Sequence, residues 1–167
     1  MELFLDNNYH FNRKILVKKI EKALLDSNSS KSIKPILLPI FKEYIEGHTN
    51  KIKNIYMDNL DGVYMGKLRS KLIDSIVLTA FDIINSKGFP VSNPTTSDYL
   101  SVIAVGGYGR NYLAPASDVD LLILTPYKIT PRIEQICETL LYLLWDLKLK
   151  VGYAIRSLEE SISKAKI

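Results

Sequence analysis

Apolar side chains recur every three or four positions along most of the first half of the chain, a spacing typical of helices with one buried face. One such run covers residues 10 to 26, and a second covers residues 36 to 45, where Pro39 either interrupts or begins the helix. The longest run covers residues 60 to 86 and stops before Gly88. The pattern therefore predicts that the first half is mostly helical.

The second half of the chain changes to short apolar runs. A stretch rich in proline, serine and threonine, residues 88 to 98, predicts an extended connector. SVIAVGG and DVDLLILT, which start at Ser101 and Asp118, are short and rich in β-branched side chains, so each predicts a buried strand. A helix is expected from residue 132 to residue 147, and KVGYAIR after it predicts a third strand.

The order of these elements predicts an α+β fold. At 167 residues the chain is long enough for one ordinary domain, or for one small domain with a helical extension. We expect residues 1–88 to form a helical N-terminal extension. Residues 89–167 are then expected to form the core, a short mixed sheet with helices.

Composition and charge exclude several classes of protein. Apolar residues make up 47% of the chain, enough to fill a core, yet no run approaches the ~18 residues of a membrane span. The formal net charge of +4 comes from dispersed Lys and Arg, so neither a membrane nor a nucleic acid is an expected partner. The start of the chain shows no secretory signal and Cys137 is the single cysteine, which together predict a cytoplasmic protein.

Asp118 and Asp120 carry the first part of the candidate chemistry. Residues two apart on a strand point to the same face, so both carboxylates are expected to project together while Val119 points the other way. Adjacent carboxylates repel each other unless a cation or proton neutralises them. Mg²⁺ takes carboxylate oxygens and leaves positions open for substrate phosphates, so Asp118 and Asp120 are predicted to be catalytic metal ligands. A loop with an acidic pair is the ordinary alternative, but the apolar residues that follow favour a strand.

The glycine pair at the end of the preceding strand is the second part. Gly106 and Gly107 permit backbone conformations closed to other residues and a close approach of a ligand to the main chain. The N–H groups of a following helix, the Arg110 guanidinium and Ser117 would add contacts to phosphate oxygens. A tight turn explains a lone glycine pair, but together with Asp-x-Asp after Ser117 it indicates a nucleotidyltransferase. GGYGRN lacks the G-x-G-x-x-G order, which argues against a dinucleotide-binding site.

The motif and its flanks resemble a known family. GG-Y-G-R-x-x-L-A-P-x-S-D-V-D-L-L resembles the DNA polymerase β-like nucleotidyltransferases, and within them the bacterial PII uridylyltransferase/uridylyl-removing enzymes. FPVSNPTTSDYL before the motif and LTPYKITPRIEQICETLLYLLWDLKLKVGYAIRSLEE after it resemble the alphaproteobacterial form. The resemblance runs from about Tyr64 to Glu160 and implies a partial polymerase β-like nucleotidyltransferase core.

This resemblance also implies an activity. The family transfers UMP from UTP, with Mg²⁺, to a tyrosine of the trimeric PII protein, a regulator of nitrogen metabolism, when glutamine is scarce. By position, the resemblance implies that Gly106 and Gly107 hold the UTP phosphates with support from Arg110. It likewise implies that Asp118 and Asp120 bind the metal.

The chain departs from the family in residues and in length. Asn111-Tyr112 stands where a Gly-Glu pair is usual, and Tyr153 stands where a histidine is usual. The HD hydrolase domain and the glutamine-sensing ACT domains of the full enzymes are absent from the sequence, which gives it the character of a fragment. KVGYAIR offers no third carboxylate, and Glu159 and Glu160 beyond it are expected at the solvated start of a helix.

Four functions therefore stay open, and the last of them is a binding or structural role without nucleotide. The first is an active uridylyltransferase toward PII. The second is an inactive, truncated remnant that keeps the motif. The third is a stand-alone nucleotidyltransferase that modifies another protein or an RNA, against which the resemblance of the flanking segments argues.

Overall fold

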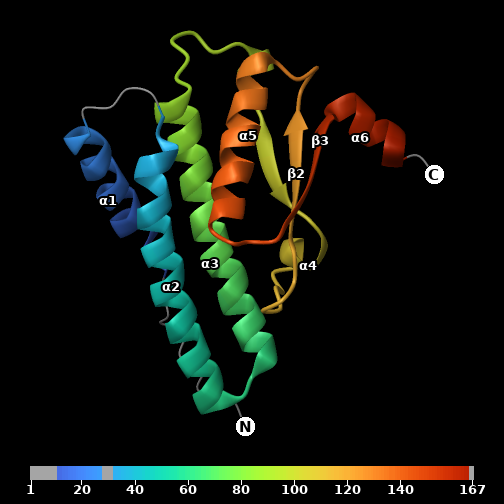
Figure 1. Ribbon diagram of the computed structural model, residues 1–167. Helices are drawn as coiled ribbons and strands as arrows, with labels where there is room; N and C mark the ends of the chain where they lie inside the picture. Colours follow the sequence, from blue (N-terminus) through green and yellow to red (C-terminus); the bar gives the residue numbers. More distant parts are fainter. Residues whose placement is uncertain (1–10, 28–31, 166–167) are drawn as a thin grey trace.

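The computed structural model describes residues 11–27 and 32–165, so His10, where the first helix was expected to begin, lies outside the described residues. Helices fill the first half and a sheet follows, which confirms the predicted α+β fold (Figure 1). The elements in chain order are α1 (Arg13–Asp26), α2 (Lys34–Asn59), α3 (Gly62–Ile83), η1 (Ile84–Gly88), η2 (Thr96–Asp98), β1 (Ser101–Ala104), α4 (Gly106–Gly109), β2 (Val119–Thr125), α5 (Pro131–Asp146), β3 (Val151–Ser157) and α6 (Leu158–Ala165).

Helices α1, α2 and α3 pack side by side and form what we call the helical layer (Figure 1). Asn12 caps α1, because its Oδ1 accepts a hydrogen bond from the Ile15 N–H at 3.2 Å. Asp61 caps α3 in the same way through the Tyr64 N–H at 2.9 Å. The layer is filled by large apolar side chains that are at most 2% exposed: Leu16, Ile20, Leu37, Phe41, Leu68, Leu72, Ile73 and Ile76.

Helix α2 is much longer than the helix predicted over residues 36–45. It runs for 26 residues, contains Pro39 and continues through Gly47. Pro39 is exposed, so its ring meets solvent and the helix loses a single N–H donor there. Beyond Gly47, Ile52 continues the buried face at 6% exposure. The boundary predicted at residue 45 is wrong because a glycine costs a helix only about 1 kcal/mol, which the burial of later side chains offsets.

Arg132, at the start of α5, fixes the connector between the two halves. Its Nε donates to the Phe89 carbonyl at 2.9 Å, and its Nη1 donates to the Asp98 carbonyl at 3.1 Å. Its Nη2 donates to Asn85 Oδ1 at 2.6 Å. One guanidinium therefore holds both ends of the extended segment that the sequence predicts.

The sheet has three strands in the order β1-β2-β3, with β2 in the centre. β1 runs antiparallel to β2, and β3 runs parallel to it, so the sheet is mixed as predicted. The register pairs Leu122 with Ile103 on one side and with Ala154 on the other. β2 begins at Val119, one residue later than predicted, so Asp118 directly precedes the strand.

The two faces of β2 differ in burial. Val119, Leu121 and Ile123 are at most 2% exposed, whereas the alternating residues Asp120 and Leu122 are partly exposed. This alternation follows from the two-residue period of a strand. The buried face therefore belongs to the core, and the other face carries Asp120.

One hydrophobic cluster joins the helical layer to the sheet. It includes side chains of α1, α2 and α3 together with Val119 and Leu121 of β2 and Ile136 and Leu140 of α5. Cys137 is buried and free, in a smaller cluster with Ile133 of the same helix and Ile123 of β2. In the described part of the chain, no helix has both the length and the hydropathy that crossing a bilayer requires.

Candidate functional site

The chain turns sharply where β1 ends. The Val105 N–H donates to the Asp120 carbonyl at 3.0 Å, which ties the end of β1 to β2. Gly106 then has a φ of 61°, in the left-handed region that favours glycine. It begins α4, the four-residue stretch Gly106–Gly109, which we call the glycine turn. The first N–H groups of a helical turn have no acceptor within that turn, and here these are the N–H groups of Gly106 and Gly107.

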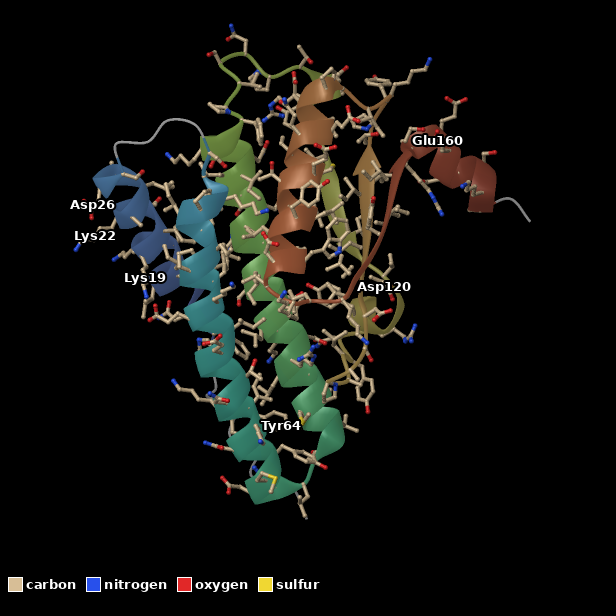
Figure 2. All side chains as sticks on the ribbon, viewed as in Figure 1. Lys19, Lys22, Asp26, Tyr64, Asp120 and Glu160 are labelled. Carbon is tan, nitrogen blue, oxygen red and sulfur yellow. The ribbon has the colours of Figure 1, made fainter. Side chains whose placement is uncertain are left out.

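The carboxylate of Asp120 lies against this glycine turn, at the end of the sheet where α4 is drawn (Figures 1 and 2). A Cβ built on Gly106 would lie 2.7 Å from Asp120 Oδ2, closer than real Cβ contacts come. Any side chain at position 106 would therefore displace the carboxylate, in addition to the strain of the positive φ. The structure thus brings together one predicted phosphate-binding residue and one predicted metal ligand.

The other predicted site residues lie around this turn and before β2. Arg110 follows α4 directly, and its Nη2 lies 4.0 Å from the position of a Cβ built on Gly107. Among residues 11–27 and 32–165, no hydrogen bond or ion pair engages the Arg110 side chain. Ser117 and Asp118 are exposed, and the Ser117 N–H donates to the Ala114 carbonyl at 3.0 Å. The side chains of Arg110, Ser117 and Asp118 are therefore accessible to a ligand.

Tyr108 anchors the glycine turn to the helical layer. Its side chain is 4% exposed, and its hydroxyl donates to Asp74 Oδ1 of α3 at 2.7 Å. Burial, and then the hydrogen bond from the hydroxyl to Asp74, raise the pKa of Tyr108 well above its usual range, so the phenol keeps its proton. Asp74 is not among the site residues that the sequence predicts. Its only signal is a carboxylate among the apolar residues of a long helix, 34 positions from its partner.

Two departures from the family pattern have structural explanations. Asn111 has a φ of 56°, and asparagine tolerates this left-handed conformation better than most residues, so it can replace the usual glycine. Tyr153 pairs in register with Leu121 and so points to the face opposite Asp120. There its ring meets the edge of Trp145 with centroids 6.1 Å apart. Neither departure alters the surroundings of the Asp120 carboxylate.

Asp118 and Asp120 supply the hard oxygen donors that Mg²⁺ prefers, and Mg²⁺ is often held by one or two carboxylates together with substrate phosphates. Within the described ranges, no group of three or more His, Cys, Asp or Glu side chains is placed to hold a metal. Glu160 caps α6, since its Oε2 accepts from the Ser157 N–H at 2.9 Å, and both Glu159 and Glu160 are exposed as predicted. The residues therefore fit a Mg²⁺ ion that binds jointly with phosphate.

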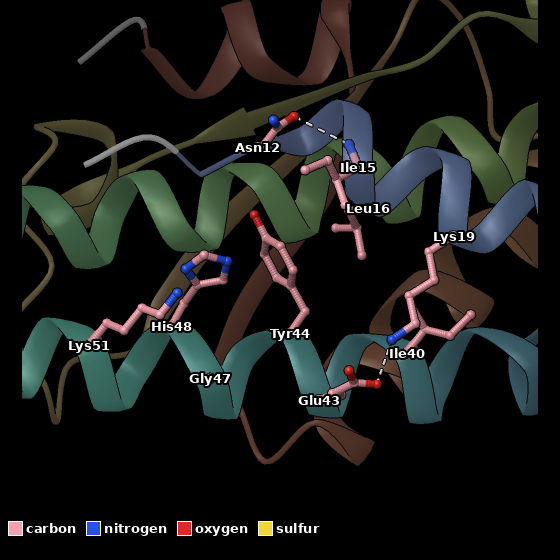
Figure 3. Close-up of a pocket in the computed structure, with 10 residues that line it drawn as sticks. All are labelled: Asn12, Ile15, Leu16, Lys19, Ile40, Glu43, Tyr44, Gly47, His48 and Lys51. Carbon is pink, nitrogen blue, oxygen red and sulfur yellow. Dashed lines mark hydrogen bonds and ion pairs between the residues drawn. The ribbon is translucent and has the colours of Figure 1, made fainter. Parts of the chain in front are cut away.

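The cavity between α1 and α2 offers a contrast (Figure 3). It has a volume of about 250 Å³, and Tyr44 lies in its wall. Some of its polar side chains have partners inside the protein: Lys19 pairs with Glu43 at 2.5 Å, and the Ser75 hydroxyl donates to the Tyr44 hydroxyl at 3.3 Å. Glu43 is the single acid among the described residues that line it. We therefore place the candidate chemistry at the end of the sheet instead.

The chain is similar to curated enzymes of three bacteria, each called a bifunctional uridylyltransferase/uridylyl-removing enzyme. It is 35% identical over 154 residues to that of Azospirillum brasilense, covering 92% of this chain and 16% of the enzyme. For Rhodospirillum rubrum the identity is 37% over 155 residues, covering 92% and 17%. For Cereibacter sphaeroides it is 46% over 96 residues, covering 58% and 10%. No protein-family model and no solved structure matches the chain.

In all of these matches the chain is much shorter than the relative. The chain spans 16% and 17% of the first two relatives, about one sixth of each. The similarity extends over nearly all of this chain, so the shared region includes both the helical layer and the glycine turn. The chain is therefore homologous to a small part of the bifunctional uridylyltransferase/uridylyl-removing enzymes.

Proposed function

We propose that this chain carries part of the active site of a cytoplasmic nucleotidyltransferase that moves UMP from UTP to a tyrosine of the PII protein, with Mg²⁺ as cofactor. One observation carries the proposal: Asp120 Oδ2 lies 2.7 Å from where a Gly106 Cβ would be. A carboxylate suited to a metal thus adjoins a turn suited to phosphates. The relatives' shared name supports uridylyl transfer. In this proposal residues 89–167 are the core and residues 1–88 a helical extension.

The glycine turn and its neighbours would bind the triphosphate. Gly106 and Gly107 have no side chains, so phosphate oxygens could approach their N–H groups closely. The exposed guanidinium of Arg110 could donate two parallel hydrogen bonds to phosphate oxygens, which an ammonium group cannot do. The Ser117 hydroxyl, next to Asp118, could donate another.

Asp118 and Asp120 would hold the Mg²⁺ ion, which when bound offsets the charge of the phosphates and of the leaving group. The tyrosine oxygen of the acceptor forms a bond to the α-phosphorus while the bond from that phosphorus to the bridging oxygen of the β-phosphate breaks. Pyrophosphate leaves and the hydroxyl proton passes to solvent. The acceptor attacks directly, so no covalent enzyme intermediate is needed.

Incubation of the purified chain with Mg²⁺, PII and UTP labelled at the α-phosphate tests this function. Label should appear on PII, and neither Asp118→Asn nor Asp120→Asn should support its transfer. A PII variant that lacks the acceptor tyrosine is the matched substrate control. Label on an RNA or another protein, but not on PII, would favour a stand-alone transferase. No transfer by this chain, with transfer by a longer product that contains it, would favour an inactive remnant.

A further inference from the structure

Gly152 lies beside Asp120 on the side away from the glycine turn. β2 and β3 run parallel, and their register pairs Asp120 with Gly152. Residues paired in this way point to the same face of a sheet. A Cβ built on Gly152 would lie 2.6 Å from Asp120 Oδ1, a separation that real Cβ atoms essentially never show.

Each carboxylate oxygen of Asp120 therefore lies against a different glycine. Oδ2 meets the Gly106 position at 2.7 Å, and Oδ1 meets the Gly152 position at 2.6 Å. The carboxylate thus lies between the glycine turn and the Gly152 position of β3. A methyl group at either position would push it into another orientation, because aspartate has only two side-chain torsions with which to respond.

Among the glycines of the described residues, Gly106 and Gly152 are the two whose added Cβ would come within 3 Å of a carboxylate oxygen. A Cβ built on Gly62 or on Gly47 would meet no atom within 4 Å. The close approach at Gly152 is therefore not a general property of glycine positions in this chain. It also leaves the β3 position beside Asp120 without a carboxylate, so this strand offers no further metal ligand at that register.

We propose that Gly152 is a positioning residue, whose missing side chain lets the Asp120 carboxylate lie close to β3 with Oδ2 toward the glycine turn. The identity of the ligand, Mg²⁺ with UTP, rests on the proposed function, but the contact itself does not. An alanine at position 152 turns the carboxylate away from β3 and so misaligns a metal ligand. Gly152 acts only through Asp120, so its effect should vanish when Asp120 is changed.

Equilibrium binding of UTP to the whole chain, measured with Mg²⁺ and again with EDTA, tests this role. Gly152→Ala should weaken binding in Mg²⁺ by at least ~10-fold, the size typical of residues that orient a metal ligand. Binding in EDTA should not change, whereas misfolding would reduce both. Gly62→Ala is the matched control and should bind as the wild type does in either condition. In an Asp120→Asn background, Gly152→Ala should have no further effect.

Two outcomes would overturn the positioning role. One is wild-type affinity of Gly152→Ala in Mg²⁺, and the other is an equal loss with and without Asp120. If the wild type itself shows no Mg²⁺-dependent binding of UTP, the proposed function fails, and a crystal structure of Gly152→Ala then decides the inference. The Asp120 side chain should take a different rotamer in that variant, and an unchanged rotamer refutes the contact.

Discussion

The helical layer and the end of the sheet that carries Asp120 differ in how their polar side chains are partnered. In the helical layer, the Arg13 Nε donates to the Thr79 hydroxyl at 3.1 Å, and Lys19 pairs with Glu43 at 2.5 Å. At the end of the sheet, Arg110 is exposed and no hydrogen bond or ion pair within the described residues engages its side chain. The polar side chains named in the first region have partners within the chain, whereas Arg110 in the second region is open to solvent.

This difference predicts which substitutions should change the stability of the fold and which should change ligand binding. Many side chains of the helical layer are buried or paired, and the loss of one of these should weaken the fold. Side chains at the end of the sheet make few contacts within the chain, so their loss should change ligand binding more than stability. Tyr108 joins the two regions through Asp74, and substitutions there should affect both.

The largest effect on stability is expected inside the helical layer. Phe41 is 0% exposed, and Phe41→Ala should lower the free energy of unfolding by about 3–5 kcal/mol, because it removes a buried ring and leaves a cavity. Urea unfolding followed by circular dichroism measures the change. Leu25→Ala is the control, since Leu25 is 85% exposed and should shift stability by less than ~0.5 kcal/mol. A small loss for Phe41→Ala would contradict the assignment of this layer as the core.

The next largest effect is expected in binding. Asp120→Asn keeps the shape of the side chain but removes its charge, so UTP affinity in Mg²⁺ should fall at least ~10-fold, about 1.4 kcal/mol. Stability should change by less than ~1 kcal/mol, because Asp120 is partly exposed. Isothermal titration calorimetry and urea unfolding of the same samples separate the two quantities. Asp58→Asn, at an exposed position near the end of α2, should alter neither. Unchanged UTP affinity of Asp120→Asn would refute the metal assignment.

A smaller effect on stability is expected where the two regions meet. Tyr108→Phe removes the hydroxyl that donates to Asp74 at 2.7 Å and should destabilise the fold by about 1 kcal/mol. For a chain of this size that corresponds to a loss of roughly 2–4 °C in Tm. Tyr127→Phe, at a residue 59% exposed, is the control and should leave Tm unchanged. An equal Tm for Tyr108→Phe and the wild type would show that the hydroxyl does not anchor the glycine turn.

Much of the fold follows from local patterns. The helical spacing around Leu72 and the strand pattern around Leu122 each depend on residues close in sequence, and both elements form where expected. The predicted end of α2 is wrong because the true end depends on contacts between residues far apart in the sequence. Gly47 is a local signal for a helix end, but the helix continues because Ile52 finds a partner surface elsewhere in the core.

The site is harder to derive because its contacts join distant segments. The sequence identifies Gly106 and Asp120 as unusual residues, yet their contact depends on the antiparallel pairing of β1 with β2. The register of β3, which brings Gly152 to Asp120, and the hydrogen bond between Tyr108 and Asp74 are likewise set by tertiary packing. No local pattern encodes these pairings.

The smallest expected effect is a pH dependence of the helical layer. His48 packs between Phe11 and Tyr44, with ring centroids 5.1 and 4.3 Å away. Burial, and then the positive charge of Lys51, lower the pKa of His48 below its usual value of about 6.5. The folded state therefore favours the neutral ring. The resulting stability is present above about pH 6.5 and is lost as pH falls through the unfolded pKa toward the lower folded one.

Thermal unfolding at pH 7.5 and pH 5.5 measures this contribution. The wild type should lose more Tm on acidification than His48→Gln does, because glutamine does not titrate. Comparing the two proteins cancels the titration of His10, which both contain. Lys51→Gln should remove only part of the difference, since burial is the larger cause of the lowered pKa. An identical loss of Tm for the wild type and His48→Gln would show that the helical layer tolerates a charged ring. The contacts around the polar groups of this layer would then matter less for stability than the comparison with the end of the sheet predicts.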